Sequence, residues 1–163
     1  MAGTTAPPAR VDATGGTGEP ARVSDRFHLS RFVDAQDAGG TYDRALRELQ
    51  AGRKRGHWMW FVFPQITGLG YSETSRHFAV SGLDEARAYL AHPVLGPRLV
   101  ECASALMTLD GTDAVAVFGP VDAQKLHSSM TLFTRAAPAE QVFRDVLDRY
   151  FGGEPDEGTT SRL

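Results

Sequence analysis

Apolar residues that recur at helical spacing constrain the fold of this chain more than any other feature of its sequence. The clearest run would follow one face of a helix: Leu99, Cys102, Ala103, Leu106 and Leu109. Spacings of three and four residues place side chains on one side of an α-helix, whereas a half-buried strand would need strict alternation. The sequence therefore predicts an all-α fold, and a length of 163 residues limits it to one ordinary domain.

Glycine, proline and polar residues mark the ends of the predicted helices. Helices are expected over about 30–36, 41–50, 81–90, 97–109, 112–117, 122–135 and 139–151. Ser81, with Asp84 three positions later, has the spacing of a capping box for the third of these. Gly119-Pro120 should interrupt the chain before residue 122, and Gly152-Gly153 should end the last helix.

Three regions of the chain differ in composition, and they define the expected domain organisation. Residues 1–24 are rich in Ala, Gly, Thr and Pro and should form a disordered tail, because they offer too little apolar surface to offset the entropy of ordering. Residues 25–153 should form the helical domain. Residues 154–163 resemble the first tail in composition, but their closeness to the last helix leaves open that they are ordered in part and fold over a site.

Composition also bears on the partners and location of the protein. A net charge of −3 provides no broad positive field, which argues against nucleic-acid binding. The longest apolar run is too short to cross a membrane, and no apolar signal segment is found near Met1, so we expect a cytoplasmic protein. The five scattered histidines lack the spacing of a metal site, so we predict no metal and no cofactor.

The segment from Gly56 to Gly70 holds both tryptophans of the chain, Trp58 and Trp60, within an apolar run. Most of these aromatic side chains should be core, and residues 57–63 could form either a buried strand or a short buried helix. His57 and Gln65 flank this run, where a buried segment emerges into loops. They could therefore line the mouth of a pocket.

A second candidate is the segment from Lys125 to Thr131. On a helix, Lys125 lies beside Ser128 and Ser129, next to the inward-facing Leu126 and Met130. A lysine beside serines can hold a phosphate or carboxylate, or act as a base for the hydroxyl. The alternative is a solvated helix face on which the serines bond back to main-chain carbonyls.

Several motifs together resemble the bacterial domain of unknown function numbered 1810, whose members have sometimes been mislabelled calpastatin. The motifs are Arg31-Phe32 with Ala35-Gln36, the aromatic segment 57–70, Tyr89-Leu90 with 92–96, Phe118-Gly119, Asp122, Lys125-Leu126 and 128–133. The similarity covers about residues 25–163. It implies a mainly helical, compact and orthogonal arrangement in which helices surround a central one. It supplies no reaction, and a calpastatin-like role does not suit a compact domain because such inhibitors are long disordered repeats.

These observations lead to one leading hypothesis and one rival. We expect a pocket for a small anionic or nucleotide-like ligand, in which Lys125 meets the anion and Gln65, Ser128 and Ser129 give hydrogen bonds. Trp58 or Trp60 would stack on a ring. If chemistry occurs, His57 is the expected acid or base, and hydrolysis of a glycosidic or phosphate bond is the expected class. The rival is a noncatalytic protein-interaction module with the aromatic segment as core and an unknown protein partner.

Overall fold

The computed structural model describes residues 26–163 of the chain, and every regular element among them is a helix. The elements are α2 (Ser30–Asp37), η1 (Ala38–Gly40), α3 (Thr41–Gln50), α4 (Met59–Val62), α5 (Glu73–His77), α6 (Leu83–Ala91), α7 (Leu95–Met107), α8 (Ala114–Ala136), α9 (Gln141–Phe151) and α10 (Glu157–Thr160). The disordered tail predicted for residues 1–24 lies outside the described residues.

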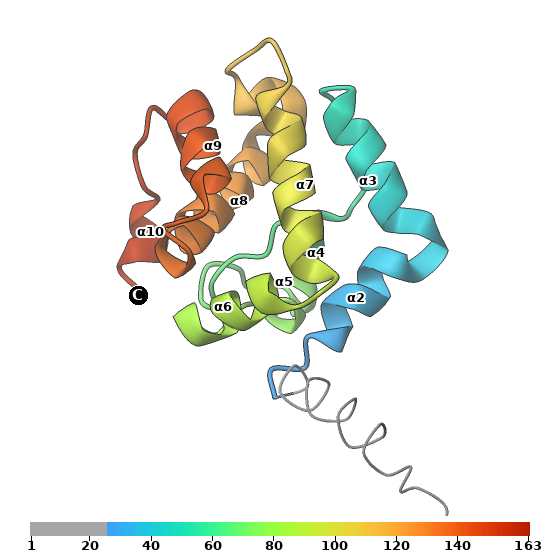
Figure 1. Ribbon diagram of the computed structural model, residues 1–163, viewed down its shortest axis with the longest axis vertical. Helices are drawn as coiled ribbons and strands as arrows, with labels where there is room; N and C mark the ends of the chain where they lie inside the picture. The colour runs from blue at the N-terminus through green and yellow to red at the C-terminus, as the bar shows by residue number, and fades with distance from the viewer. Residues whose placement is uncertain (1–25) are drawn as a thin grey trace, which may run out of the picture.

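The helices pack around α8. This helix contacts α4, α6, α9 and α10, while α7 packs across α3, α6 and α9. Figure 1 shows α9 and α10 on one side of the molecule and α2 and α3 on the other, with α7 in front of α8. The predicted all-α fold, with helices surrounding a central one, is therefore confirmed. Among residues 26–163, no helix has the length and apolar character needed to cross a membrane.

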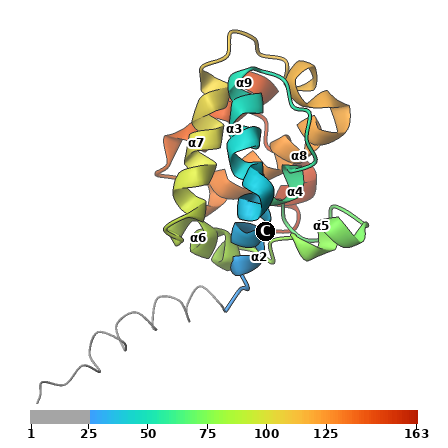
Figure 2. The same cartoon turned by 90° about the vertical axis from the view of Figure 1, so that its right-hand side faces the viewer.

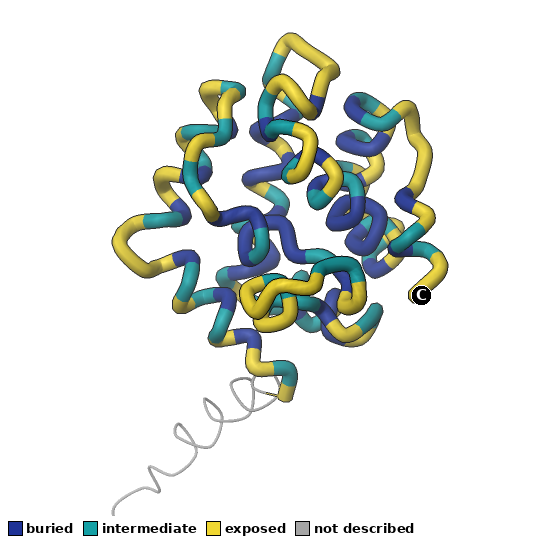
Figure 3. Tube along the Cα trace, turned by 180° about the vertical axis from the view of Figure 1, so that it is seen from behind, coloured by how far each residue is buried: buried dark blue, intermediate teal, exposed yellow. Residues whose placement is uncertain are grey.

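Buried residues are concentrated at the centre of the molecule, and the outer loops carry most of the exposed residues (Figure 3). The aromatic segment contributes much of this core, since Trp58 and Phe63 are only 2% and 0% exposed. Trp60 is different because it is half-buried. The expectation of a mostly buried aromatic segment therefore holds for Trp58 and Phe63 but is too strong for Trp60.

Residues 59–62 form the short helix α4, which settles the choice between strand and helix. The helix ends at Phe63, whose ψ angle of 72° is outside the helical region. Pro64 follows it, and a proline disfavours helical geometry in the residue before it.

The capping box predicted from Ser81 and Asp84 is not formed. α6 begins at Leu83 after Gly82, which makes no side-chain cap. Ser81 instead donates from its backbone N–H and its hydroxyl to Glu85 Oε1, at 3.0 and 2.9 Å. The other oxygen of Glu85 lies 2.7 Å from Arg31 Nη2, so this carboxylate is held by a tertiary ion pair that local spacing could not reveal.

The predicted break at Gly119-Pro120 is present as a kink within α8. Gly119 has φ 79° and ψ 165°, a backbone conformation that residues with a side chain rarely adopt. Pro120 then opens the second part of the helix, where its missing N–H is tolerated because first-turn donors have no partner within a helix. This break sets the direction of the helical segment that carries Lys125.

Candidate functional site

One face of α8 forms the floor of a cleft. Val121, Gln124, Lys125 and Ser128 line it. Their positions follow the i, i+3, i+4, i+7 pattern, which places four side chains on one side of a helix. The cleft encloses about 630 Å³, a volume typical of sites for small molecules.

A loop after the aromatic segment forms the second wall, with Gln65, Leu69, Gly70, Tyr71, Ser72 and Ser75 lining the cleft. The backbone of Gln65 is fixed because Val80 N–H donates to its carbonyl at 2.9 Å, beside an isolated parallel bridge between Ile66 and Val80. Gly70 packs so closely that a Cβ there would lie 2.5 Å from the side chain of Ser75. The loop runs into α5 at the periphery of the molecule (Figure 2).

The C-terminal segment forms the third wall through Asp156 and Gly158. Arg162 ties it to the loop, because its guanidinium donates to the carbonyls of Gly158 at 2.7 Å and Gly68 at 3.3 Å. Gly68 has φ 96°, and a Cβ there would lie 2.7 Å from Arg162 Nε. A side chain at this position would therefore disturb the contact between the two walls.

Asp156 joins the C-terminal segment to α8. Its carboxylate accepts from Gln124 Nε2 at 2.9 Å and Ser128 Oγ at 3.0 Å, and from the N–H and hydroxyl of Thr159 at 3.1 and 2.7 Å. Burial alone would raise the pKa of Asp156, but the hydrogen bonds from Thr159, Ser128 and Gln124 outweigh it and lower the pKa below its ordinary value of 3.8. The carboxylate is therefore a charged anchor for α10.

We expect Asp156→Asn to lower the free energy of unfolding by about 1.5–3 kcal/mol at pH 7, because it weakens hydrogen bonds to a charged acceptor. A carboxyl group with a lowered pKa stabilises the fold above the ordinary value of 3.8, and that contribution is lost as the pH falls through the lowered pKa. Urea unfolding of wild type and variant should therefore show a stability gap at pH 7 that narrows below pH 3.8. Asp34→Asn, at an exposed position of α2, is the matched control and should show little gap. A gap for Asp156→Asn that does not change with pH would contradict the role given to its charge.

The two lysines of the chain meet at one carboxylate beside the cleft. Lys125 Nζ lies 3.3 Å from Asp122 Oδ1, and Lys54 Nζ lies 2.8 Å from Asp122 Oδ2. The two ammonium groups also lie over the two tryptophan rings. Lys54 Nζ is 5.0 Å from the ring centroid of Trp58, and Lys125 Nζ is 5.4 Å from that of Trp60. Two positive charges share one negative charge, so the cluster carries a net positive charge at the edge of the cleft.

The rim of the cleft is unusually apolar. Tyr71 and Val121 are 84% and 68% exposed, and they are two of the three large hydrophobic side chains that the described residues expose. Both line the cleft. Clustered exposed apolar side chains are typical of binding surfaces.

The structure brings together three of the side chains that the sequence singled out, namely Gln65, Lys125 and Ser128. The remaining four lie outside the lining of the cleft. His57 is exposed at the entry to the aromatic segment, Trp58 is buried, and Trp60 reaches the site only through its contact with Lys125.

Ser129 is 0% exposed, and its hydroxyl has no hydrogen-bond partner. It lies on the buried face of α8, three residues after Leu126 and four before Phe133, and both of these side chains are fully buried. Ser128 and Ser129 are adjacent in the sequence but point in different directions from the helix, so Ser128 lines the cleft and Ser129 lies in the core.

Sequence reasoning missed Tyr71, Val121, Gln124 and Asp156. Val121 and Gln124 share helical spacing with Lys125 and Ser128, so the sequence held a signal for both. Val121 is apolar, and an apolar residue on a polar helix face does not by itself predict a binding site. Asp156 and Tyr71 reach the site by tertiary packing of distant segments, which local patterns do not show.

Comparison with known families gives one match, to the protein family of unknown function DUF1810, over residues 26–163. The chain belongs to this family. It is also similar to the conserved hypothetical protein Rv1873 from Mycobacterium tuberculosis, and comparison of that crystal structure with the structure of this chain gives a TM-score of 0.82. The sequence identity is 50%, over 85% of this chain and 98% of the other. No curated protein matches the chain significantly.

Proposed function

We propose that the cleft binds a small ligand that combines a ring or other apolar body with one anionic group, as a mononucleotide does. The observation that carries this proposal is the meeting, in one cleft, of Lys125 with the exposed apolar side chains of Tyr71 and Val121. The apolar part of the ligand would cover Tyr71 and Val121, and Gln65 would supply a hydrogen bond from the opposite wall.

The charges around Lys125 favour an anion. Asp122 neutralises only one of the two ammonium groups that it contacts. The other carboxylate of the cleft, Asp156, is already engaged by four donors, which reduces its repulsion of an incoming anion. An anion beside Lys125 would therefore complete the charge balance of the cluster.

Binding suits this site better than hydrolysis. Ser128 donates to Asp156, but the lowered pKa of that carboxyl makes it a weak base for activating a hydroxyl. His57 lies outside the cleft lining and has no part in the proposed site.

Thermal-shift measurements with mononucleotides and aromatic carboxylates test the proposal, because a ligand that binds only the native state raises its melting temperature. We expect compounds that carry both a ring and an anion to raise it more than the same rings without the charge. If neither class has an effect at millimolar concentration, the proposal is wrong.

Lys125→Met and Leu126→Ala should have opposite effects. Lys125→Met should weaken binding about tenfold or more, as expected for the loss of a charge-assisted contact worth roughly 1.5–3 kcal/mol, and leave the fold intact. Leu126 is 0% exposed, so its truncation should lower the free energy of unfolding by about 2–5 kcal/mol. Calorimetric titration with the best compound from the thermal screen, together with urea unfolding, measures both effects.

The control for Lys125→Met is Arg144→Met, at an exposed position of α9 outside the cleft lining. It removes one positive charge from the chain without touching the site. Equal weakening by both variants would show that net charge, and not the cleft, governs binding.

The rival function, a noncatalytic protein-interaction module, is favoured by the same exposed apolar rim. A protein partner would cover Tyr71 and Val121 without requiring the charge of Lys125. Val121→Asp would then abolish the interaction while Lys125→Met left it unchanged, which separates the two functions.

A further inference from the structure

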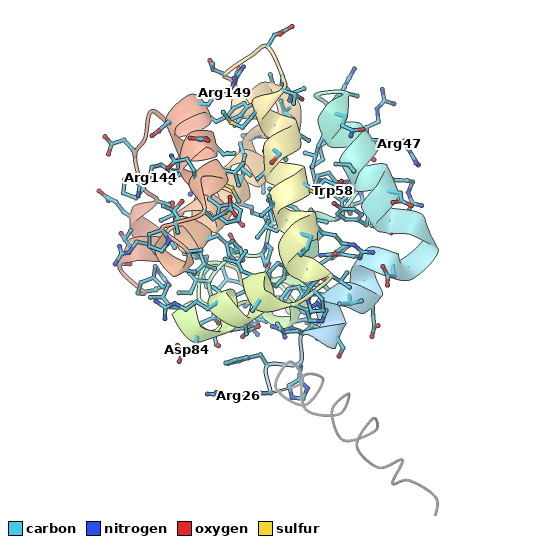
Figure 4. The ribbon with its side chains drawn as sticks, in the orientation of Figure 1. Arg26, Arg47, Trp58, Asp84, Arg144 and Arg149 are labelled. Atoms are coloured by element: carbon cyan, nitrogen blue, oxygen red, sulfur yellow. The ribbon has the colours of Figure 1, made fainter. Side chains whose placement is uncertain are left out.

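Four arginines surround a second concavity, away from the cleft. Arg44 and Arg47 come from α3, and Arg53 and Arg55 come from the loop that follows it. With Glu48 and Ala51 they line a hollow of about 450 Å³. All four arginines are exposed, and Figure 4 shows Arg47 directed outward from α3. We call this feature the arginine pocket.

The acidic residue of the arginine pocket, Glu48, holds the main chain in place. Its Oε1 accepts from Arg55 N–H at 2.7 Å, from Gly56 N–H at 2.9 Å and from Trp58 Nε1 at 2.9 Å. Among residues 26–163, no ion pair joins any of the four guanidinium groups to a carboxylate. The arginine pocket therefore carries a net charge of +3.

The loop that presents Arg53 and Arg55 is fixed before any ligand arrives. Arg53 N–H donates to the carbonyl of Glu48 at 3.0 Å, and Lys54 N–H donates to the carbonyl of Val117 at 2.9 Å. The side chain of Lys54 turns inward to Asp122, while the arginines on either side of it turn to solvent. The main chain that carries these two arginines is therefore ordered before binding, so only their side chains lose freedom when a ligand binds.

We propose that the arginine pocket binds a group of two or more linked phosphates. Guanidinium groups pair with phosphate oxygens through two parallel hydrogen bonds, and several of them around one hollow match a compact polyanion better than a single charge. The polar lining separates this site from the cleft, whose rim is apolar. The same phosphate group could belong to free inorganic polyphosphate or to a nucleoside triphosphate.

Calorimetric titration of the full chain with inorganic triphosphate, ATP and inorganic phosphate tests the proposal. We expect triphosphate and ATP to bind at least about tenfold more tightly than phosphate, with affinities that fall as salt is raised. Tighter binding of triphosphate than of ATP would identify the free polyphosphate as the better source. Tighter binding of ATP that persists in Lys125→Met, whose cleft lacks its ammonium group, would identify the nucleotide as the better source for the arginine pocket. If neither binds more tightly than phosphate, the proposal is overturned.

The double variant Arg47→Gln with Arg55→Gln should weaken triphosphate binding by about tenfold for each arginine, because each loses a charge-assisted contact. The exposed Arg144→Gln is the control and should bind as wild type does. Lys125→Met should also leave triphosphate binding unchanged, so that failure of the cleft and failure of the arginine pocket can be told apart. Unchanged binding by the double variant would overturn the proposal, as would tighter binding of a short single-stranded DNA than of triphosphate. Circular dichroism of each variant checks that the fold is kept.

Discussion

Gly96→Ala should lower the free energy of unfolding by about 3 kcal/mol, at the upper end of the cost of overpacking a core. A Cβ at Gly96 would lie 2.0 Å from the carbonyl oxygen of Leu90 and 2.9 Å from its carbonyl carbon. Both atoms are backbone, so a side-chain rotation cannot relieve the clash. The first turn of α7 would have to move away from the last turn of α6, against which α7 packs.

Urea unfolding measures this effect, and Gly111→Ala is the matched control. A Cβ at Gly111 meets nothing within 4 Å, so that variant should stay within about 0.5 kcal/mol of wild type. Wild-type stability in Gly96→Ala would contradict the close approach of α6 and α7.

The second large effect is expected for Trp58→Ala, which should lower the free energy of unfolding by about 3–5 kcal/mol. Trp58 is 2% exposed, and its indole N–H donates to Glu48 Oε1 at 2.9 Å. Removal of the ring leaves a cavity and also removes one of the contacts that hold Glu48. Figure 4 places this side chain between α3 and α7.

Trp60→Ala provides the comparison, because Trp60 is half-buried and should cost less. Trp58→Phe should fall between the two, since it keeps most of the apolar volume but has no N–H to donate. Thermal and urea unfolding of the three variants give the order. A larger loss for Trp60→Ala than for Trp58→Ala would contradict the assignment of Trp58 to the core.

The fold could be predicted from the sequence because its helices are amphipathic and sharply bounded. Predicted residues 41–50 match α3 in full, and the helix predicted over about 81–90 ends within one residue of the end of α6 at Ala91. Local residue spacing predicted the N-terminal cap of α6 less well. The partner of Ser81 is Glu85, whose position depends on an ion pair with Arg31, far away in the sequence.

The candidate site could be predicted only in part. Gln65, Lys125 and Ser128 were found because each lies at a polar edge of an apolar element. Asp156 was missed because its place depends on hydrogen bonds that join the C-terminal segment to α8. His57 was expected at a pocket mouth, but the chain enters α4 directly after Trp58 and leaves His57 exposed outside the lining.

The charge around Lys125 could not be predicted from its neighbours in the sequence. Its contact with Asp122 alone would suggest a neutral structural pair. Lys54, which is distant in sequence, takes the other oxygen of the same carboxylate and leaves an excess positive charge. The proposed preference for an anion therefore depends on a tertiary contact.

Mapping of backbone amide shifts by two-dimensional NMR, during titration with the compound that gives the largest thermal shift, tests the central claim most directly. The cleft proposal predicts that the shifted amides gather in residues 65–75, 121–128 and 156–158, and that Lys125→Met weakens the response. Shifts gathered instead around residues 44–55, or an undiminished response in Lys125→Met, would contradict it.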